Sequence, residues 1–386
     1  MIINHFTDND LYKFSTMFAI QKLYPNAYVR YQFFNRGQTP FPDGFAEELR
    51  KEVDSMSTLY LTKVEKQYII KRCYFFDPVF IDFLEGYRYD PSEVKIEQIG
   101  GELKVEVEGY WFRTVLWEVP LMSIISELYF KMLGIKPEDV TERTQDKAVF
   151  LKDIEADYSD FGTRRRFSFD IQDQVVKILK EYSGDYFKGT SNVYLAMKHD
   201  TLPIGTHPHE WFMYHGAKYG YRMANAKALD AWVDVYQGSL GLALTDTYTT
   251  ESFFRSFSLK HAKLFDGVRW DSGDPIEFTD TVIDFYTKNR IDPTSKTVVY
   301  SDSLNVQKVK EIKDYVNGRV HDTYGIGTFF TNDVGTTPLN IVIKLTDVKA
   351  KPEDEYLGAI KLSDVKGKNT GNIKEIEIAK LTLGIE

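Results

Sequence analysis

Residues 267–275 read Gly-Val-Arg-Trp-Asp-Ser-Gly-Asp-Pro, a short strand pattern that passes through a polar turn into the start of a helix. Either aspartate could cap that helix. Asp274 fills this role, because Pro275 suits the first helical position, where its missing N–H is not needed. Asp271 then remains free at the tip of the strand. The stretch therefore predicts one βα unit with an uncommitted carboxylate at the carboxyl end of its strand.

Similar units follow one another from about residue 201 onward. Strands are expected at Thr201–Ile204, Leu240–Thr245, Gly267–Asp271, Thr297–Ser301 and Arg319–Tyr324. Helical patterns lie between them, such as Thr250–Leu264 and Leu304–Tyr315. Repeated βα units predict a parallel sheet, either open or closed as a barrel. In both arrangements, ligands bind at the carboxyl ends of the strands.

The first third of the chain has a different pattern. Strands are expected at Ala27–Phe34 and Leu103–Glu108, the second of which alternates apolar and charged residues, and Val119–Leu133 is expected to form an apolar helix. The tail from Leu339 returns to strand-like patterning, at Ile341–Ile343 and Ile376–Leu383. We therefore expect an α/β protein. Its N-terminal α/β domain with an antiparallel sheet spans 1–130 and is rejoined by 336–386, and a βα-barrel-like domain spans 131–335.

Composition excludes several classes of protein. The chain has 386 residues and a formal net charge of −9, which argues against a general nucleic-acid binder. Cys73 is the only cysteine, so intramolecular disulfides and thiol-zinc sites are excluded. The first residues lack the pattern of a signal peptide, and no stretch reaches 18 uncharged apolar residues. A cytoplasmic protein that neither spans nor binds a membrane is expected.

A second informative stretch, 202–211, runs from a strand through Gly205 into two histidines. Pro208 suits the first helical position, which puts His209 in the first turn of a helix. The positive end of the helix dipole attracts phosphate and disfavours protonation of the imidazole. His209 is therefore a candidate neutral nucleophile. The alternative is a partly buried histidine bonded to a backbone carbonyl.

Polar residues end three further strands. Asp246 follows the second expected strand and Asp302 the fourth, and strand-tip carboxylates suit ribose hydroxyls or a hydrated Mg²⁺. After the fifth strand, Gly325 and Gly327 allow backbone N–H groups to converge on an anion, with the Thr328 hydroxyl as a further donor. As the last in a series of polar strand ends, this loop predicts a sugar-phosphate site.

Two upstream segments complete the set of candidates. Residues 160–168 hold three consecutive arginines beside Phe161, and these guanidinium groups could pair with phosphate while the ring stacks on a flat ligand. The alternative is a solvated run of charge. Residues 189–192 form a small polar turn in which Ser191 or Asn192 could cap a helix, the reading that local evidence favours.

Together these motifs resemble the nicotinate phosphoribosyltransferase family of type II phosphoribosyltransferases. The matching segments occur in the family's order and are Asn9–Tyr12, Asp160–Arg165, Gly189–Val193, Gly205–Trp211, Leu244–Tyr248, Arg269–Pro275 and Gly325–Thr328. The combination is highly specific although each piece alone is modest. The resemblance implies an N-terminal α/β domain followed by a βα-barrel-like phosphoribosyltransferase domain.

The resemblance also implies a reaction. Nicotinate is joined to 5-phosphoribosyl 1-diphosphate, giving nicotinate mononucleotide and diphosphate in NAD biosynthesis. ATP hydrolysis is coupled to this ligase-type step through a phosphorylated histidine, with Mg²⁺ as cofactor. By motif position that histidine is His209, because His207 occupies a place that varies in the family. The catalytic residues implied are His209, Asp271 and Arg269, and no Mg²⁺ ligand is identified.

The resemblance assigns substrate contacts as well. Phe161 and Arg269 would sandwich the pyridine ring, and Tyr12 would cover it from a second subunit, which implies a homodimer. The remaining implied contacts are Thr206 to nicotinate, Arg164 to phosphate, Asp246 and Asp271 to the ribose and Mg²⁺ region, and Ser301, Asp302, Gly327 and Thr328 to the 5-phosphoribosyl end.

Ser191 bears on the choice of substrate. In the related nicotinamide-using enzyme an aspartate occupies this place, and a carboxylate there would repel nicotinate, whereas a serine hydroxyl can donate to it. Ser191 and the histidine-helix motif therefore favour nicotinate over nicotinamide or quinolinate. A non-catalytic phosphosugar-binding protein is a further alternative, as is a βα-barrel lyase or isomerase. The latter would need a lysine or a paired acid and base at a strand end.

Overall fold

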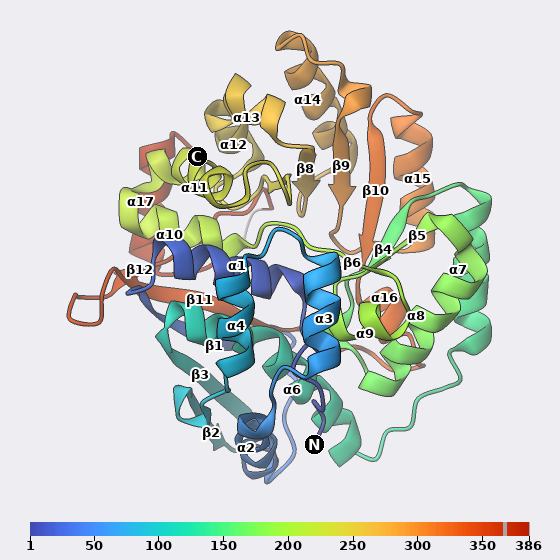
Figure 1. Cartoon of the computed structure of the whole chain (residues 1–386), viewed down its shortest axis with the longest axis vertical. Helices are drawn as coiled ribbons and strands as arrows, with labels where there is room; N and C mark the ends of the chain where they lie inside the picture. The colour runs from blue at the N-terminus through green and yellow to red at the C-terminus, as the bar shows by residue number, and fades with distance from the viewer. Residues whose placement is uncertain (366–368, 386) are drawn as a thin grey trace.

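The computed structural model describes residues 1–365 and 369–385, which form two sheets with helices around and between them (Figure 1). The first sheet has five antiparallel strands in the order β12-β11-β1-β3-β2, and the second has seven parallel strands in the order β6-β5-β4-β10-β9-β8-β7. The strands are β1 Tyr28–Asn35, β2 Val94–Ile99, β3 Glu102–Tyr110, β4 Tyr158–Asp160, β5 Phe187–Thr190, β6 Leu202–Pro203, β7 Leu242–Leu244, β8 Gly267–Trp270, β9 Thr297–Tyr300, β10 His321–Ile326, β11 Ile341–Lys349 and β12 Leu357–Gly358.

The helices occupy most of the remaining chain. They are α1 Leu11–Leu23, α2 Phe45–Ser55, α3 Lys63–Arg72, α4 Pro78–Gly86, α5 Trp111–Thr114, α6 Glu118–Met132, α7 Thr141–Asp153, α8 Phe169–Ser183, α9 Val193–Lys198, α10 His209–Tyr219, α11 Tyr221–Tyr236, α12 Thr250–Ser256, α13 Leu259–Leu264, α14 Pro275–Lys288, α15 Val306–Val316, α16 Thr328–Thr331 and α17 Ile373–Leu383.

The antiparallel sheet is built on β1, which lies between β3 and β11. Tyr31 pairs with Val107 on one side and Leu345 on the other, and all three side chains are buried. Successive residues of a strand point to opposite faces, so the intervening polar residues of these strands face outward. The buried face packs on α6, and α10 contacts β11 as well.

The parallel sheet has the strand order of a barrel that is open at one place. Consecutive strands are neighbours except β6 and β7, which form the two edges, and β10 pairs with β4. Pro203 in β6 suits an edge strand because proline lacks an N–H for further pairing. Helices α10 and α11 are inserted between the two edge strands along the chain. The helix that begins at His209 therefore belongs to the chain segment that connects the two edge strands.

The structure confirms the α/β fold class, with an antiparallel sheet and a curled parallel sheet. The parallel sheet also starts earlier than the pattern indicated, because β4 and β5 precede Thr201. Thr250–Leu264 forms two helices rather than one, since Ser258 caps a new helix by accepting from the His261 N–H. The domain boundaries at 130 and 335 stay predictions.

The strand expected at Ile376–Leu383 is wrong, because these residues lie in helix α17. Their alternating apolar residues resemble a strand, but the buried pair is Ala379 and Leu383, four residues apart on one helical face. Asn372 caps the helix start, and Gly384 ends the helix with a left-handed φ of 67°. The helix packs on α11, whereas β11 does pair with β1 of the first sheet.

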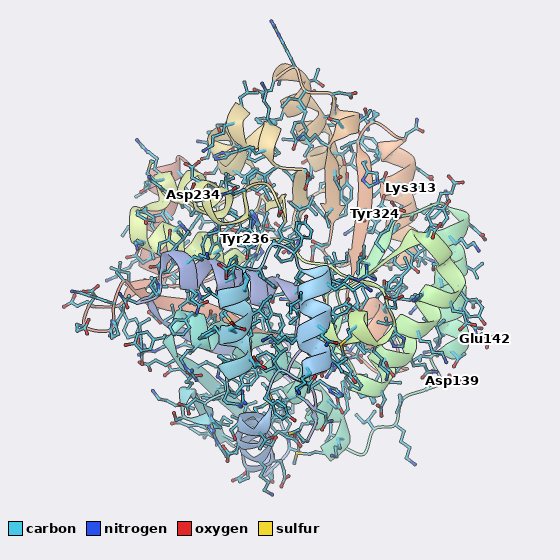
Figure 2. All side chains as sticks on the ribbon, in the orientation of Figure 1. Asp139, Glu142, Asp234, Tyr236, Lys313 and Tyr324 are labelled. Atoms are coloured by element: carbon cyan, nitrogen blue, oxygen red, sulfur yellow. The ribbon has the colours of Figure 1, made fainter. Side chains whose placement is uncertain are left out.

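Figure 2 shows Asp139 and Glu142 at the outer edge of the molecule, near α7. Tyr236 is buried, and all five tryptophans are buried too. Among the described residues, no helix has the length and apolar character needed to cross a membrane.

Candidate active site

A cavity of about 230 Å³ lies where the carboxyl ends of the parallel strands face α1, α10 and β11. Charged and aromatic side chains from both sheets line it. Those that matter most for the chemistry are Tyr12, Tyr31, Arg36, Glu118, Arg164, His209, Glu210, Arg269, Asp271, Asp302, Lys344 and Lys361. Six of the thirteen residues that the sequence suggested for the site are among them. These six are Tyr12, Arg164, His209, Arg269, Asp271 and Asp302.

His209 is the first residue of α10, and Pro208 before it is the N-cap rather than the first helical residue as expected. The difference arises because Pro208 has an extended ψ of 154°, which a helical residue cannot adopt. The His209 side chain is 24% exposed. Its Nδ1 lies 3.0 Å from the Thr247 hydroxyl, and its Nε2 lies 3.0 Å from Asp271 Oδ2. Burial, together with the charge of Lys361, lowers the pKa of His209 and favours the neutral imidazole.

Asp271 is the centre of a hydrogen-bonded cluster at the tip of β8. It accepts from the Arg269 guanidinium at 2.6 Å and from the Ser301 hydroxyl at 2.8 Å. Arg269 also donates to the Thr206 hydroxyl at 2.8 Å. Burial acts to raise the pKa of Asp271, but Arg269 and His209 outweigh it and hold that pKa well below its usual range. Asp271 is therefore an ionised carboxylate that contacts His209 and lines the cavity.

Asp274 caps α14 as the sequence indicated. Its side chain accepts from the backbone N–H groups of Ile276 and Glu277, and Pro275 begins the helix. Asp271 is thereby left for other contacts.

Asp246 lies one layer behind the cavity and is fully buried. Its Oδ2 accepts from Lys361 at 2.9 Å and from Ser272 at 2.7 Å, whereas its Oδ1 has no hydrogen-bond partner in the part of the chain that the structure describes. His209, Asp246 and Asp271 could present one atom each to a metal ion, within 4.8 Å of one another. The unpartnered carboxylate oxygen fits a hard cation such as Mg²⁺, for which the two aspartates are suitable ligands.

The three consecutive arginines have three different environments. Arg164 is exposed to the cavity and forms an ion pair with Glu118 at 3.5 Å. Arg165 is half-buried, and its burial beside Arg164 lowers its pKa to about 10. Arg166 is fully buried in an ion pair with Asp8 at 2.7 Å. Only Arg164 of the three lines the cavity, so the run is neither a solvated stretch nor a single phosphate clamp.

Phe161 and the loop that holds Gly325 and Gly327 are not among the residues that line the cavity. A Cβ atom on Gly325 would come within 2.3 Å of the Phe161 ring, so the close approach requires glycine there. The buried Asp160 carboxylate accepts from the Gly162 N–H at 2.8 Å and from the Thr190 hydroxyl at 2.7 Å. The Phe161 turn is thereby tied to the turn that carries Ser191. Gly327 and Thr328 follow at the start of α16 and also stay off the described wall.

Ser191 is buried and donates its hydroxyl to Asp10 at 2.7 Å. The cap of the following helix α9 is Asn192, which accepts from the Leu195 N–H. Tyr12 lines the cavity of its own chain, where its hydroxyl donates to Glu118 at 3.3 Å. A role for Tyr12 in a neighbour's pocket stays a prediction.

Sequence reasoning missed several charged residues of the site. Lys361 is one, and its ammonium lies 2.9 Å from His209 Nε2. It is held there because the Leu362 N–H donates to the Thr247 carbonyl at 2.8 Å, a contact across more than a hundred residues. Two further examples are Arg36, which directly follows β1, and Lys344, which lies in β11. No local motif marks any of the three, and only the pairing of distant segments reveals them.

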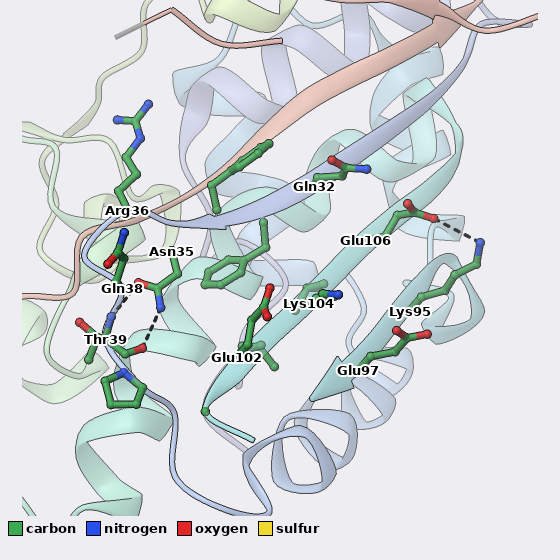
Figure 3. A pocket seen from close by; sticks show the side chains of 16 residues that line it. Gln32, Asn35, Arg36, Gln38, Thr39, Lys95, Glu97, Glu102, Lys104 and Glu106 are labelled. Carbon is green, nitrogen blue, oxygen red and sulfur yellow. Dashed lines mark hydrogen bonds and ion pairs between the residues drawn. The ribbon is translucent and has the colours of Figure 1, made fainter. Parts of the chain in front are cut away.

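A second, larger hollow lies on the outer face of the antiparallel sheet (Figure 3). Two pairs of its polar residues interact with each other. Asn35 donates to the Thr39 carbonyl at 2.7 Å, and Lys95 forms an ion pair with Glu106 at 3.3 Å. Arg36 is the one residue described in the walls of both hollows. The candidate catalytic groups gather at the smaller cavity.

Fold and site place the chain among α/β enzymes whose anionic ligands bind at the carboxyl ends of parallel strands. A family model described as the nicotinate phosphoribosyltransferase family matches residues 156–381, and one for the N-terminal domain of that family matches residues 7–126. The chain belongs to the nicotinate phosphoribosyltransferase family.

Relatives agree with this assignment. The chain is 50% identical to the nicotinate phosphoribosyltransferase of Chromohalobacter salexigens, covering 100% of this chain and 99% of the relative. It is 42% identical to that of Methanococcoides burtonii, over 99% and 98% of the two chains. The crystal structure of the Porphyromonas gingivalis enzyme superposes with a TM-score of 0.98 at 46% identity, covering 100% of both chains. The protein is an enzyme of this family.

His207 is not a second candidate nucleophile, because it is fully buried among Trp232, Phe212 and Phe265. Neither of its ring nitrogens has a hydrogen-bond partner among residues 1–365 and 369–385. Burial, with a contribution from Arg269, lowers its pKa to about 3.

This burial predicts a pH dependence of stability. The unfolded chain binds a proton at His207 below about pH 6.5, which the folded state excludes until about pH 3. Stability should therefore fall as the pH drops through this window, by about 1.4 kcal/mol per pH unit from this group. In His207→Phe this contribution to the pH dependence of the free energy of unfolding should vanish. Urea unfolding at pH 5 and pH 7 measures the two free energies. A replacement at the half-buried His199 is the control, and an identical slope in His207→Phe and the parent would refute the prediction.

Proposed function

We propose that the protein transfers the 5-phosphoribosyl group of 5-phosphoribosyl 1-diphosphate to nicotinate, forming nicotinate mononucleotide and diphosphate. The observation that carries the proposal is the cluster of Arg269, Asp271 and His209 in one cavity with further basic groups. Relatives over the full length carry the name of this activity.

The residues present suit the glycosyl transfer. The pyridine nitrogen of nicotinate forms a bond to C1 of the ribose as the bond from C1 to the diphosphate oxygen breaks. Positive charge develops on the ribose in this step, and the Asp271 carboxylate at the cavity, with Asp246 behind it, would stabilise this charge. Arg36, Arg164 and Lys344 line the same cavity and can bind the departing diphosphate. Mg²⁺, when bound by the two aspartates, would neutralise part of the diphosphate charge.

We further propose that ATP hydrolysis is coupled through His209. The imidazole nitrogen takes the γ-phosphoryl group as ADP leaves, and water later cleaves the phosphorus–nitrogen bond to release phosphate. Partial exposure, a lowered pKa and a place at the start of α10 all support His209 in this role. The buried His207 offers no accessible nitrogen.

Binding of nicotinate by Ser191 and assembly into a homodimer are separate proposals. For Ser191 to donate to nicotinate, its hydroxyl has to exchange Asp10 for the substrate carboxylate. A homodimer with sites completed by Tyr12 of each neighbour is the expectation from the family resemblance, and sedimentation at working concentration measures it. A cytoplasmic location likewise stays an expectation.

The test is product formation by the purified protein. Nicotinate, nicotinamide and quinolinate are each supplied with 5-phosphoribosyl 1-diphosphate and Mg²⁺, with and without ATP. Nicotinate mononucleotide should form, and ATP should be hydrolysed in step with it. Preference for another pyridine would replace the proposed substrate. Binding of the phosphosugar without any product would instead support the non-catalytic alternative.

Lys344 provides a separate prediction about anion binding. Burial, with repulsion from Arg36 and Lys361, lowers the pKa of Lys344 to about 7. At pH 8 the free protein therefore holds this amine mostly neutral, and a bound diphosphate should raise its pKa and cause proton uptake. Titration calorimetry in two buffers of different ionisation enthalpy measures this uptake.

Changes in the protonation of diphosphate itself contribute equally to the proton uptake of every variant. The difference in proton uptake between two variants therefore reports the contribution of Lys344. Lys344→Met should take up fewer protons than the parent and bind diphosphate more weakly below pH 7. Lys104→Met, on the exposed wall of the second hollow, should match the parent. Equal uptake in the parent and Lys344→Met would assign the proton to another group.

A further inference from the structure

A buried lysine stands behind the wall of the candidate active site and has no part in the chemistry described so far. Lys13, on α1, has a side-chain exposure of 0%. Its ammonium forms ion pairs with both Glu118 and Glu210. A buried charge is costly unless it is paired, so this arrangement holds only while both carboxylates stay in place.

Each of the two carboxylates is tied to a different side of the cavity. Glu118, at the start of α6, accepts from the Tyr12 hydroxyl at 3.3 Å and pairs with Arg164 at 3.5 Å. Glu210 directly follows His209 in the first turn of α10. Lys13 therefore connects the arginine side of the cavity to the histidine side.

The Glu210 carboxylate is held firmly from the other direction as well. The Tyr31 hydroxyl on β1 donates to its Oε2, and the indole Nε1 of Trp111 lies 2.9 Å from the Tyr31 oxygen. All of these groups are buried. A shift of Glu210 would thus move the first turn of α10 and change the 3.0 Å contact between His209 and Asp271.

The charges of this network balance. Lys13 and Arg164 carry two positive charges, and Glu118 and Glu210 carry two negative charges. Removal of the lysine would leave the buried Glu210 and the half-buried Glu118 with Arg164 as the remaining cation, and like charges in one site repel. One carboxylate would then move toward water, and Glu210, which has no second cation within ion-pair distance among the described residues, is the one expected to move.

We propose that Lys13 is a positioning residue that fixes His209 through Glu210 and Arg164 through Glu118, without touching the substrates. The proposal rests on the function proposed above. A lysine needed only for folding would lower stability and leave the kinetic constants of the folded enzyme unchanged. A positioning lysine changes those constants, because small displacements of reacting groups cost large factors in rate.

The experiment compares Lys13→Met with Lys296→Met, a matched control at a second buried lysine. Lys296 donates to the Phe265 carbonyl at 2.6 Å and precedes β9, at the opposite end of the strands from the cavity. Initial rates of nicotinate mononucleotide formation are measured well below the unfolding temperature of each variant. Lys13→Met should lower kcat by at least about tenfold and raise the KM for 5-phosphoribosyl 1-diphosphate. Lys296→Met should lower the unfolding temperature only.

Glu210→Gln keeps the test valid if Lys13→Met does not fold, because it retains the shape of Glu210 and the pair between Lys13 and Glu118. Glu210→Gln should lower kcat with little change in the KM for 5-phosphoribosyl 1-diphosphate. Where both single variants fold, the double variant should be no worse than the poorer single one, since both break the same contact. Unchanged kcat and KM in the folded single variants would overturn the proposal.

A readout independent of turnover separates this proposal from the proposed function. The NMR resonances of the His209 ring should shift in Lys13→Met and stay in place in Lys296→Met. If the parent enzyme forms no product, the proposed function fails, and unshifted His209 resonances would overturn the positioning role by themselves.

Discussion

His209→Ala is expected to abolish transfer of phosphate from γ-labelled ATP to the protein, leaving less than about a hundredth of the parent's acid-labile label. The reason is that His209 combines an exposed edge, a neutral ring and a place at the anion-attracting start of α10. Stimulation of product formation by ATP should disappear with the label. Labelling with γ-labelled ATP and acid release of the bound phosphate measure the first effect, and rates of product formation with and without ATP measure the second.

The control for this variant is His199→Ala. His199 lies at the end of α9 and bonds Asp173 at 2.8 Å, away from the cavity. This variant should be labelled as fully as the parent. Undiminished label in His209→Ala would remove the phosphohistidine assignment, and because His207 is inaccessible, the search would turn to the carboxylates of the cavity.

Asp271→Asn should lower kcat by about 10² to 10³, with a folded structure retained. Asparagine keeps the shape of the side chain but removes the charge that faces Arg269 and His209. The positive charge that develops on the ribose then loses a stabilising carboxylate. Steady-state kinetics with saturating substrates measure the loss, and circular dichroism verifies the fold.

Asp274→Asn is the matched control, because it lies in the same loop and only caps α14. Asparagine is as good a cap as aspartate, so kcat should change by less than about twofold. A similar loss of kcat in both variants would show that the loop as a whole, rather than the Asp271 charge, matters. An unaffected Asp271→Asn enzyme would contradict the catalytic role directly.

Asp271 and Asp274 also show why part of the site could be predicted from the sequence. The cap role of Asp274 depends on Pro275 and on two N–H groups within three residues, so the chemistry is local. The same holds for His209, whose place in a first turn follows from the residues beside it. The carboxyl ends of neighbouring parallel strands lie at the same edge of a sheet, so polar residues at these ends lie close together. The contacts among Asp271, Ser301 and Arg269 could therefore be predicted.

Lys361, Lys344 and Lys13 could not be found in this way. Each is an ordinary charged residue in its own segment, and its importance arises from a partner far away along the chain. The helix at Ile373–Leu383 is a related case. Its alternating apolar residues fit a strand equally well, and packing of Ala379 and Leu383 against other parts of the protein decides for the helix.

Local chemistry in the sequence thus sufficed for the α/β class, the helix caps, the strand-tip aspartates and the histidine at a helix start, since each depends on neighbours a few residues apart. Long-range folding had to bring β11 against β1, place Lys361 beside His209 and bury Lys13 between two carboxylates. The physical reason is that burial and charge pairing depend on every segment that surrounds a group. A cavity lined by these charged groups therefore exists only once distant segments have packed together.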